Sequence, residues 1–334
     1  MRVGFNPQKS EKKINLTTYH RVIVVVYIPN EEGFYKNSYD VFKLCLDSLV
    51  ATTNSNSAIT IVNNGSYDKV TDLLQNYLKN KKIDSLIQHS VNIGKIDALI
   101  GAARGARERL ITYSDSDILF KKGWQENVEK VFSIFPNVGS VSPISVRYGL
   151  FYGTSSVLKQ IILGKIKIKF EPIPENFDSY NKYLKSINWD EDKEETNNWP
   201  VIEKNNTKAV VGSGHQVLTV SREVLFKSVP TNPSLTLVGG DSEYKYVDEP
   251  IDKLGKLRLC TYTNFAFHMG NNIEDWMIDV QKNNLITTTD FTEMYYENKT
   301  NFDLFYSKYK TIIYQIKKKI TKKVFKLIYK NYSL

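Results

Sequence analysis

Apolar runs alternate with segments of helical periodicity along the first third of the chain. The short apolar runs predict four strands, at 21–28, 58–62, 85–88 and 110–113. Apolar side chains at three- and four-residue spacing predict three helices between them, at 39–51, 70–78 and 97–109. This β-α-β-α-β-α-β order is typical of a doubly wound, mostly parallel sheet, so we expect an α/β fold.

The pattern in the second half is mixed. We expect further helices and strands at 123–135, 138–146, 209–220, 257–262 and 264–267, with a bend at 212–215. A helix with acidic residues in its first turn is expected to begin at 239–248, where the helix dipole favours negative charge. The polar, acidic stretch 171–200 is interpreted as an inserted loop or lid.

Polar clusters follow each of the predicted parallel strands, at Tyr27–Glu31, Asn63–Ser66, Asn92–Lys95 and Asp115–Asp117. Ligands bind at the carboxyl ends of the strands in such sheets, so the four clusters are expected to converge on one edge. Asp115 and Asp117 are separated by one residue, and alternate side chains of a strand share a face. Such a pair can hold Mn²⁺ or Mg²⁺, although a solvated acidic turn has the same pattern.

The order of these segments resembles nucleotide-sugar-dependent glycosyltransferases of the GT-A fold, most closely family 2. The motifs that carry the resemblance are Tyr27-Ile-Pro-Asn-Glu, Val62-Asn-Asn-Gly-Ser, Asn92-x-Gly-Lys, Asp115-Ser-Asp117, Gly240-Asp-Ser-Glu and His268. The resemblance implies a GT-A domain over 15–275, with a nucleotide-binding half at 15–120 and an acceptor half at 121–275. A helical, basic tail would then occupy 276–334.

The resemblance also implies roles for individual residues. The nucleotide-sugar would be bound by Tyr27, Pro29, Asn30, Glu31, Asn63, Asn64, Asn92, Lys95, Ser114, Asp115 and Ser116. The divalent ion would be held by Asp115, Asp117 and His268. Relatives often have Asp where Asn63 or Asn64 stands, so base recognition would differ in detail. The alternatives are a surface role for Lys95 and a structural one for His268.

An inverting transfer needs a carboxylate to take a proton from the acceptor hydroxyl. The resemblance assigns this base to Asp241, with Glu243 as its neighbour, although Gly240 stands where relatives usually have Glu. The alternative is that both carboxylates merely cap a helix.

The 334 residues carry a net charge of +9, which is unevenly distributed. Nine lysines and one acid, Asp303, give the last 34 residues, 301–334, a charge of +8, which leaves +1 for the remainder. The nearly neutral body argues against a nucleic-acid-binding face. Residues 1–15 lack the apolar region of a signal peptide, and the two cysteines form no disulfide framework, so a cytoplasmic location is expected.

The tail has apolar residues at helical spacing from Phe302 to Ile328, with lysines between them. A basic amphipathic helix of this kind favours docking on an anionic membrane surface. The alternatives are a helix packed on the domain and a partner helix in a dimer.

These observations lead to one functional hypothesis. The protein is expected to be a metal-dependent glycosyltransferase that moves a sugar from a nucleotide-sugar, such as a UDP-sugar, to a glycan or lipid-linked acceptor. We expect inversion and a role in bacterial surface polysaccharide synthesis, with the enzyme peripheral on the inner face of the cytoplasmic membrane. The alternatives are a retaining GT-A enzyme, a nucleotidyltransferase or a basic nucleic-acid-binding protein.

Overall fold

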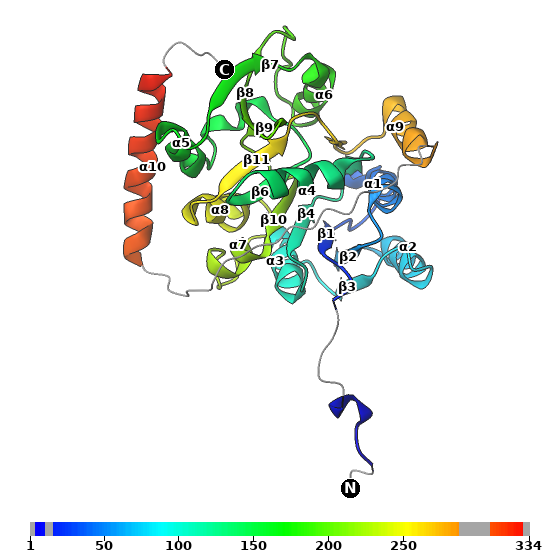
Figure 1. The fold of residues 1–334 in the computed structure, drawn as a ribbon. Helices are drawn as coiled ribbons and strands as arrows, with labels where there is room; N and C mark the ends of the chain where they lie inside the picture. The colour runs from blue at the N-terminus through cyan, green and yellow to red at the C-terminus, as the bar shows by residue number, and fades with distance from the viewer. Residues whose placement is uncertain (1–3, 11–15, 287–307, 330–334) are drawn as a thin grey trace.

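The computed structural model describes residues 4–10, 16–286 and 308–329. A ten-stranded sheet forms the centre of the molecule, in the order β3-β2-β1-β4-β10-β6-β11-β9-β8-β7 (Figure 1). Its strands are β1 His20–Val26, β2 Ser57–Asn64, β3 Ser85–His89, β4 Leu110–Ser114, β6 Val138–Ser142, β7 Ile168–Pro172, β8 Asn198–Lys204, β9 Thr207–Val211, β10 Val217–Ser221 and β11 Leu257–Thr261. A separate two-stranded sheet pairs β5, Ile118–Phe120, with β12, Ala266–His268.

Strand direction divides the sheet into two halves. The four strands from β3 to β4 are parallel, as the alternation of strands and helices predicts. Next to them, β10 is antiparallel to both β4 and β6, and β11 is parallel to β6. The antiparallel strands β9, β8 and β7 complete the far edge. The carboxyl ends of β1, β2, β3 and β4 therefore share one edge.

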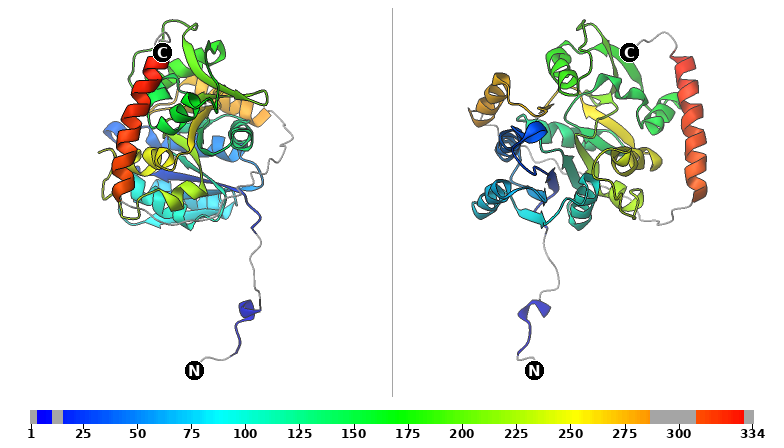
Figure 2. Two further views of the ribbon diagram at one scale, coloured as in Figure 1. Left: turned by 60° about the vertical axis from the view of Figure 1, so that its left-hand side comes forward. Right: turned by 180° about the vertical axis from the view of Figure 1, so that it is seen from behind.

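Helices cover both faces of the sheet (Figure 2). They are α1 Ser38–Thr52, α2 Asp68–Lys79, α3 Lys95–Gly105, α4 Trp124–Ile134, α5 Ser155–Ile162, α6 Phe177–Ser186, α7 Arg222–Lys227, α8 Glu249–Lys253, α9 Asp275–Ile286 and α10 Lys308–Ile328, with a π-helical turn at Tyr244–Asp248. Short 3₁₀ turns lie at Pro7–Lys9, Gly33–Tyr35, Arg147–Phe151 and Pro174–Asn176.

The two faces of β1 are buried in different cores. Val22 and Val24 belong to the core that contains residues of α1, α2 and α4. Ile23 and Val25 belong to the core that contains residues of α3, α7 and α8. A continuous β-branched run suits a strand that is buried on both sides, and this explains the composition of 21–28.

The predicted α/β class and the C-terminal helix are confirmed. The interpretation of 171–200 as a loop or lid is wrong, because this stretch contains α6 and the start of β8. Tyr180 and Leu184 of α6 are buried, and the Tyr180 ring packs edge-on against Trp199 at 5.0 Å. Two apolar residues four apart are a weak helical signal within a polar stretch, which is why the pattern missed it.

Helix α10 packs beside α5 along one side of the molecule (Figure 1). Phe325 is buried and stacks on Tyr329 at 4.5 Å, and Tyr314 donates a hydrogen bond to Asp252 of α8. The domain limits 15–275 and 276–334 remain a proposal. Helix α9 lies within the second range and packs on α1, while residues 287–307 and 330–334 of that range lie outside the described residues.

Candidate active site

The strand ends of β2 and β3 form a connected polar edge. Asn64 donates a hydrogen bond to the Asn92 side chain at 2.9 Å and accepts one from the Ile93 N–H. Asn63 is fully buried, and it contacts Thr71, Gln88 and the Ser66 N–H. Asn63 therefore holds the turn after β2, and Asn64, which is also buried, ties this turn to the half-buried Asn92 at the sheet edge.

The residues after β1 are more exposed. Asn30 accepts a hydrogen bond from the Glu32 N–H, and Glu31 pairs with Lys69 at 2.5 Å and with the Tyr67 hydroxyl. Tyr27 lines a large cleft, while Pro29, Asn30 and Glu31 do not. The structure thus brings Tyr27 to the cleft and leaves its three neighbours on the outside of the loop.

Lys95 begins α3 and lies between two carboxylates. Its ammonium is 2.7 Å from Asp115 and 3.9 Å from Glu243. Burial alone would lower the pKa of Lys95, but the neighbouring carboxylates outweigh burial and raise this pKa. Lys95 is therefore not an isolated surface lysine. It is a cation that faces the segment 115–117, which carries the two predicted metal ligands Asp115 and Asp117 and is called the metal signature below.

A loop from the second half of the chain fixes the start of α3. The Lys95 N–H donates to the carbonyl of Leu237, and Asp97 accepts from the N–H groups of Ser234 and Leu235. Gly94 has a φ of +96°, and a Cβ there would lie 2.4 Å from the Thr236 carbonyl oxygen. Glycine is thus required for the loop to close over this turn.

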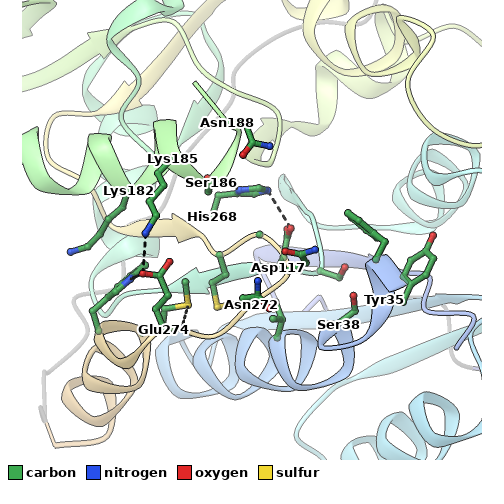
Figure 3. A pocket seen from close by; sticks show the side chains of 18 of the residues that line it. Tyr35, Ser38, Asp117, Lys182, Lys185, Ser186, Asn188, His268, Asn272 and Glu274 are labelled. Atoms are coloured by element: carbon green, nitrogen blue, oxygen red, sulfur yellow. Dashed lines mark hydrogen bonds and ion pairs between the residues drawn. The ribbon is translucent and has the colours of Figure 1, made fainter. Parts of the chain in front are cut away.

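Asp117 and His268 meet in the wall of the large cleft. The His268 Nε2 is 3.2 Å from an Asp117 oxygen, and its Nδ1 is 2.8 Å from the Ser186 hydroxyl (Figure 3). Antiparallel pairing of β12 with β5 sets His268 opposite Ile118, beside the metal signature. Burial alone would lower the pKa of His268, but Asp117 raises it.

These residues fit a divalent ion in part. The second oxygen of Asp117, Oδ1, is buried and has no hydrogen-bond partner among the described residues, so it is free to coordinate. Asp115 is instead engaged by Lys95. Within the described part of the chain, no three acidic, histidine or cysteine residues are grouped closely enough to form a complete metal site. Asp117 and His268 are the best-placed protein ligands.

The acidic segment at 240–243, which follows β10 and α7, directs the Glu243 carboxylate toward Lys95 and Asp115. Glu243 lines a small recess with Lys95 and Asp115, and the Ser242 hydroxyl donates to Glu243. Burial alone would raise the pKa of Glu243, but backbone hydrogen bonding and Lys95 lower it. Asp241 is exposed, with a φ of +61°, and lines neither the recess nor the large cleft.

The large cleft has a volume of about 730 Å³ and lies between α1, α6 and α9 (Figure 3). Its lining includes Ser116 beside the metal signature, and aromatic, amide and lysine side chains, among them Tyr35, Asn181, Lys182, Lys185 and Trp276. The Lys182 ammonium lies 4.7 Å from the centre of the Trp276 ring. Sequence reasoning missed the α6 contribution because it treated that stretch as a loop.

The family model described as "Glycosyl transferase family 2" matches residues 33–187. The predicted resemblance to family 2 glycosyltransferases is confirmed for that stretch. No curated protein matches the sequence.

Three solved structures match part of this chain at low identity. A mannosyltransferase from Pyrobaculum calidifontis, in complex with GDP-Man and Mn²⁺, is 16% identical; the match covers 74% of this chain and 55% of that one, with a TM-score of 0.41. S. aureus TarS 1–349 in complex with UDP-GlcNAc is 12% identical; the match covers 79% of this chain and 64% of that one, with a TM-score of 0.39. GalNAc-T7 with UDP, GalNAc and Mn²⁺ is 14% identical; the match covers 77% of this chain and 44% of that one, with a TM-score of 0.42. The chain spans less than two thirds of each.

Proposed function

We propose that this protein is a metal-dependent glycosyltransferase that transfers a sugar from a nucleotide-sugar to a hydroxyl of a glycan or lipid-linked acceptor. One observation carries the proposal. Lys95, Asp115, Asp117, Glu243 and His268 come from four separate segments of the chain and meet at one sheet edge. The family 2 match over residues 33–187 supports the same activity.

The nucleotide is proposed to bind along the edge formed by Tyr27, Asn64, Asn92 and Lys95. The amide groups of Asn64 and Asn92 offer donors and acceptors to a base or ribose, and the Lys95 ammonium suits a diphosphate. Ser114 and Ser116 flank Asp115 at the same strand end. When the donor binds, the Lys95 ammonium is proposed to leave Asp115 and to pair with the phosphate oxygens instead.

Mn²⁺ or Mg²⁺ is proposed to be held by Asp117 and His268, with Asp115 joining once Lys95 has turned to the diphosphate. Carboxylate and imidazole groups suit such ions, and a bound cation would offset the charge that develops on the leaving diphosphate. The Ser186 hydroxyl contacts the other ring nitrogen of His268 and orients the imidazole toward Asp117.

Proton removal from the acceptor is assigned to the segment that carries Asp241 and Glu243. Glu243 lines the recess and lies 3.9 Å from Lys95, so its carboxylate is placed to accept a proton beside the proposed donor site. Asp241 is the alternative base and would have to turn inward. A carboxylate in this role implies an inverting transfer.

We further propose that α10 docks the enzyme on an anionic membrane, which suits a lipid-linked acceptor of bacterial surface polysaccharide synthesis. Its inner face packs on the domain through Tyr314, Lys318 and Phe325. Its outer face exposes Ile312, Ile316, Ile320 and Leu327, and is bordered by the exposed lysines Lys317, Lys319 and Lys323. Among the described residues no helix is long and apolar enough to cross a membrane.

Calorimetric titration of UDP in the presence and absence of Mn²⁺ tests the activity. We expect Mn²⁺ to strengthen UDP binding, and the substitution Asp117→Ala to remove that gain, because it deletes the partnerless oxygen. Asp279→Ala, on the exposed face of α9, is the matched control and should titrate like the unaltered protein. Equal Mn²⁺ dependence in the Asp117→Ala variant would show that the ion is held elsewhere.

A further inference from the structure

His215 lies in the bend between β9 and β10, and no role has been assigned to it so far. Together with Lys95, Asp115 and Glu243 it lines the recess on the α3 side of the sheet edge. The side chain is 29% exposed, so one part of the imidazole is accessible from the recess. The bend places this histidine beside the metal signature, because the Gln216 carbonyl accepts a hydrogen bond from the Asp115 N–H.

The opposite side of the imidazole is fixed by a buried cluster. The His215 Nδ1 is 3.0 Å from Asp248, whose side chain is 0% exposed. The same Asp248 oxygen accepts a hydrogen bond from the Tyr152 hydroxyl at 2.9 Å. Its second oxygen is 2.9 Å from the fully buried guanidinium of Arg258. Asp248 is thereby held rigidly and cannot follow the ring if it rotates.

This arrangement determines which nitrogen faces the recess. A carboxylate at Nδ1 favours a proton on that nitrogen, so Nε2 is left for another partner. Among the described residues His215 makes no other hydrogen bond besides the one to Asp248. Asp248 thus orients the imidazole of His215, and the second ring nitrogen lies beside other polar groups. This arrangement is suited to contact with a ligand.

The groups around Nε2 indicate the chemistry of that ligand. Lys95 of α3 donates hydrogen bonds, whereas Asp115 after β4 and Glu243 of the acidic segment accept them. The recess has a volume of about 10 Å³, which leaves room for a single hydroxyl, and a sugar hydroxyl can both donate to and accept from its polar members. The recess also adjoins Lys95, the proposed diphosphate ligand, and the transferred sugar is attached directly to the diphosphate.

We propose that His215 Nε2 hydrogen-bonds a hydroxyl of the transferred sugar and contributes to the choice of donor. In this scheme Asp248 is a positioning residue that acts through His215. The inference rests on the proposed function, since it assumes that a nucleotide-sugar occupies the site. It adds a determinant of sugar specificity that lies outside the strand-end motifs.

The test compares the affinity for nucleotide-sugars with the affinity for the corresponding nucleoside diphosphates. UDP, UDP-GlcNAc, UDP-glucose, GDP and GDP-mannose are titrated with Mn²⁺ into the unaltered protein. The ratio of the two dissociation constants, diphosphate over nucleotide-sugar, measures what the sugar contributes. For the best nucleotide-sugar we expect His215→Ala to lower this ratio about five- to tenfold, the scale of one lost hydrogen bond, while affinity for the diphosphate is unchanged.

Two further variants separate ligand contact from a structural role. Tyr152→Phe removes one contact that holds Asp248 while Arg258 still pairs with this carboxylate, so the ratio should fall less than in His215→Ala. His215→Gln keeps a polar group of similar length, so its ratio should lie between those of the unaltered protein and His215→Ala. This variant replaces His215→Ala in the test if the alanine variant does not fold.

An unaltered ratio in both His215 variants, with diphosphate binding intact, would overturn this inference alone. A protein that binds the diphosphates and gains no affinity from any attached sugar would also overturn it. If the unaltered protein bound none of the five compounds, the proposed function itself would fail, and the inference with it.

Discussion

At Lys95 a single ammonium group faces two carboxylates to which we assign different duties. Asp115 is 2.7 Å away and belongs to the metal signature, whereas Glu243 is 3.9 Å away and belongs to the acidic segment. The cation pairs with both carboxylates in the absence of substrate. Because Asp115 and Glu243 share one ammonium group, the two carboxylates must also lie close to each other.

The identity of the base can be decided by a pair of matched substitutions. We expect Glu243→Gln to lower turnover at least about a hundredfold, the usual scale for loss of a general base, while donor affinity changes little. Asp241→Asn should lower turnover far less, because Asp241 is exposed and lines neither cavity. The measurement is the initial rate of nucleoside diphosphate release from a nucleotide-sugar. The opposite ranking of the two variants would assign the base to Asp241.

The strand-end motifs were predictable because they follow the strands directly in the sequence. The position of Glu243 relative to Lys95 was not, since it depends on how the loop at 230–240 folds over Gly94. His215 was missed for the same reason: its role depends on Asp248 and Arg258, which are distant in sequence and meet only in the folded chain. No local pattern encodes such long-range pairings.

At the level of elements, hydrophobic periodicity located the parallel half of the sheet and its helices. It missed α6, whose few apolar residues stand within a polar stretch, and it did not single out α9. It described α10 as amphipathic but could not tell which face is turned inward. The structure shows that aromatic residues, and not the isoleucines, contact the domain.

The outward isoleucines of α10 give a direct test of membrane docking. The double substitution Ile316→Asp and Ile320→Asp should reduce binding to phosphatidylglycerol-containing vesicles at least about tenfold, because two exposed apolar side chains no longer enter the bilayer. Leu235→Asp, at an even more exposed apolar site outside α10, is the control and should bind normally. Binding is measured by sedimentation, with and without high salt.

Truncation is a poorer experiment for the same question. Deleting α10 would remove Phe325, which is buried, and would uncover the face of α5 on which the helix packs. Vesicle binding that survives both aspartates would show that α10 is a structural helix or a contact between protein copies.

At the scale of the whole molecule, one buried ion pair links three strands of the sheet. Arg21 of β1 makes two hydrogen bonds to Glu108, which precedes β4, and one to Thr60 of β2. Burial alone would raise the pKa of the Glu108 carboxyl, but Arg21 and Thr18 outweigh burial and lower it to about 2. The unfolded chain binds this proton near pH 4.5, so the contribution to stability is complete above that pH and is lost toward pH 2.

We therefore expect Glu108→Gln to lower the free energy of unfolding by about 3 kcal/mol near pH 6, as removal of one partner from a buried pair does. The difference between the variant and the unaltered protein should shrink as the pH falls from 4.5 toward 2. Urea unfolding at several pH values measures both quantities. The exposed pair of Glu203 with Lys169 supplies the control, since Glu203→Gln should cost less than about 1 kcal/mol. A difference that is constant with pH would contradict the assigned pKa.

The contact between Lys95 and Asp115 has a thermodynamic consequence for the order of events at the site. A metal ion that arrives alone must compete with an ammonium for the carboxylate, and a nucleotide that arrives alone must draw the ammonium away from it. When both arrive, the diphosphate takes the ammonium and the ion takes the carboxylate, so each ligand removes the obstacle to the other. Binding of ion and nucleotide is then positively cooperative, and because such coupling is reciprocal, each must strengthen the other by the same factor.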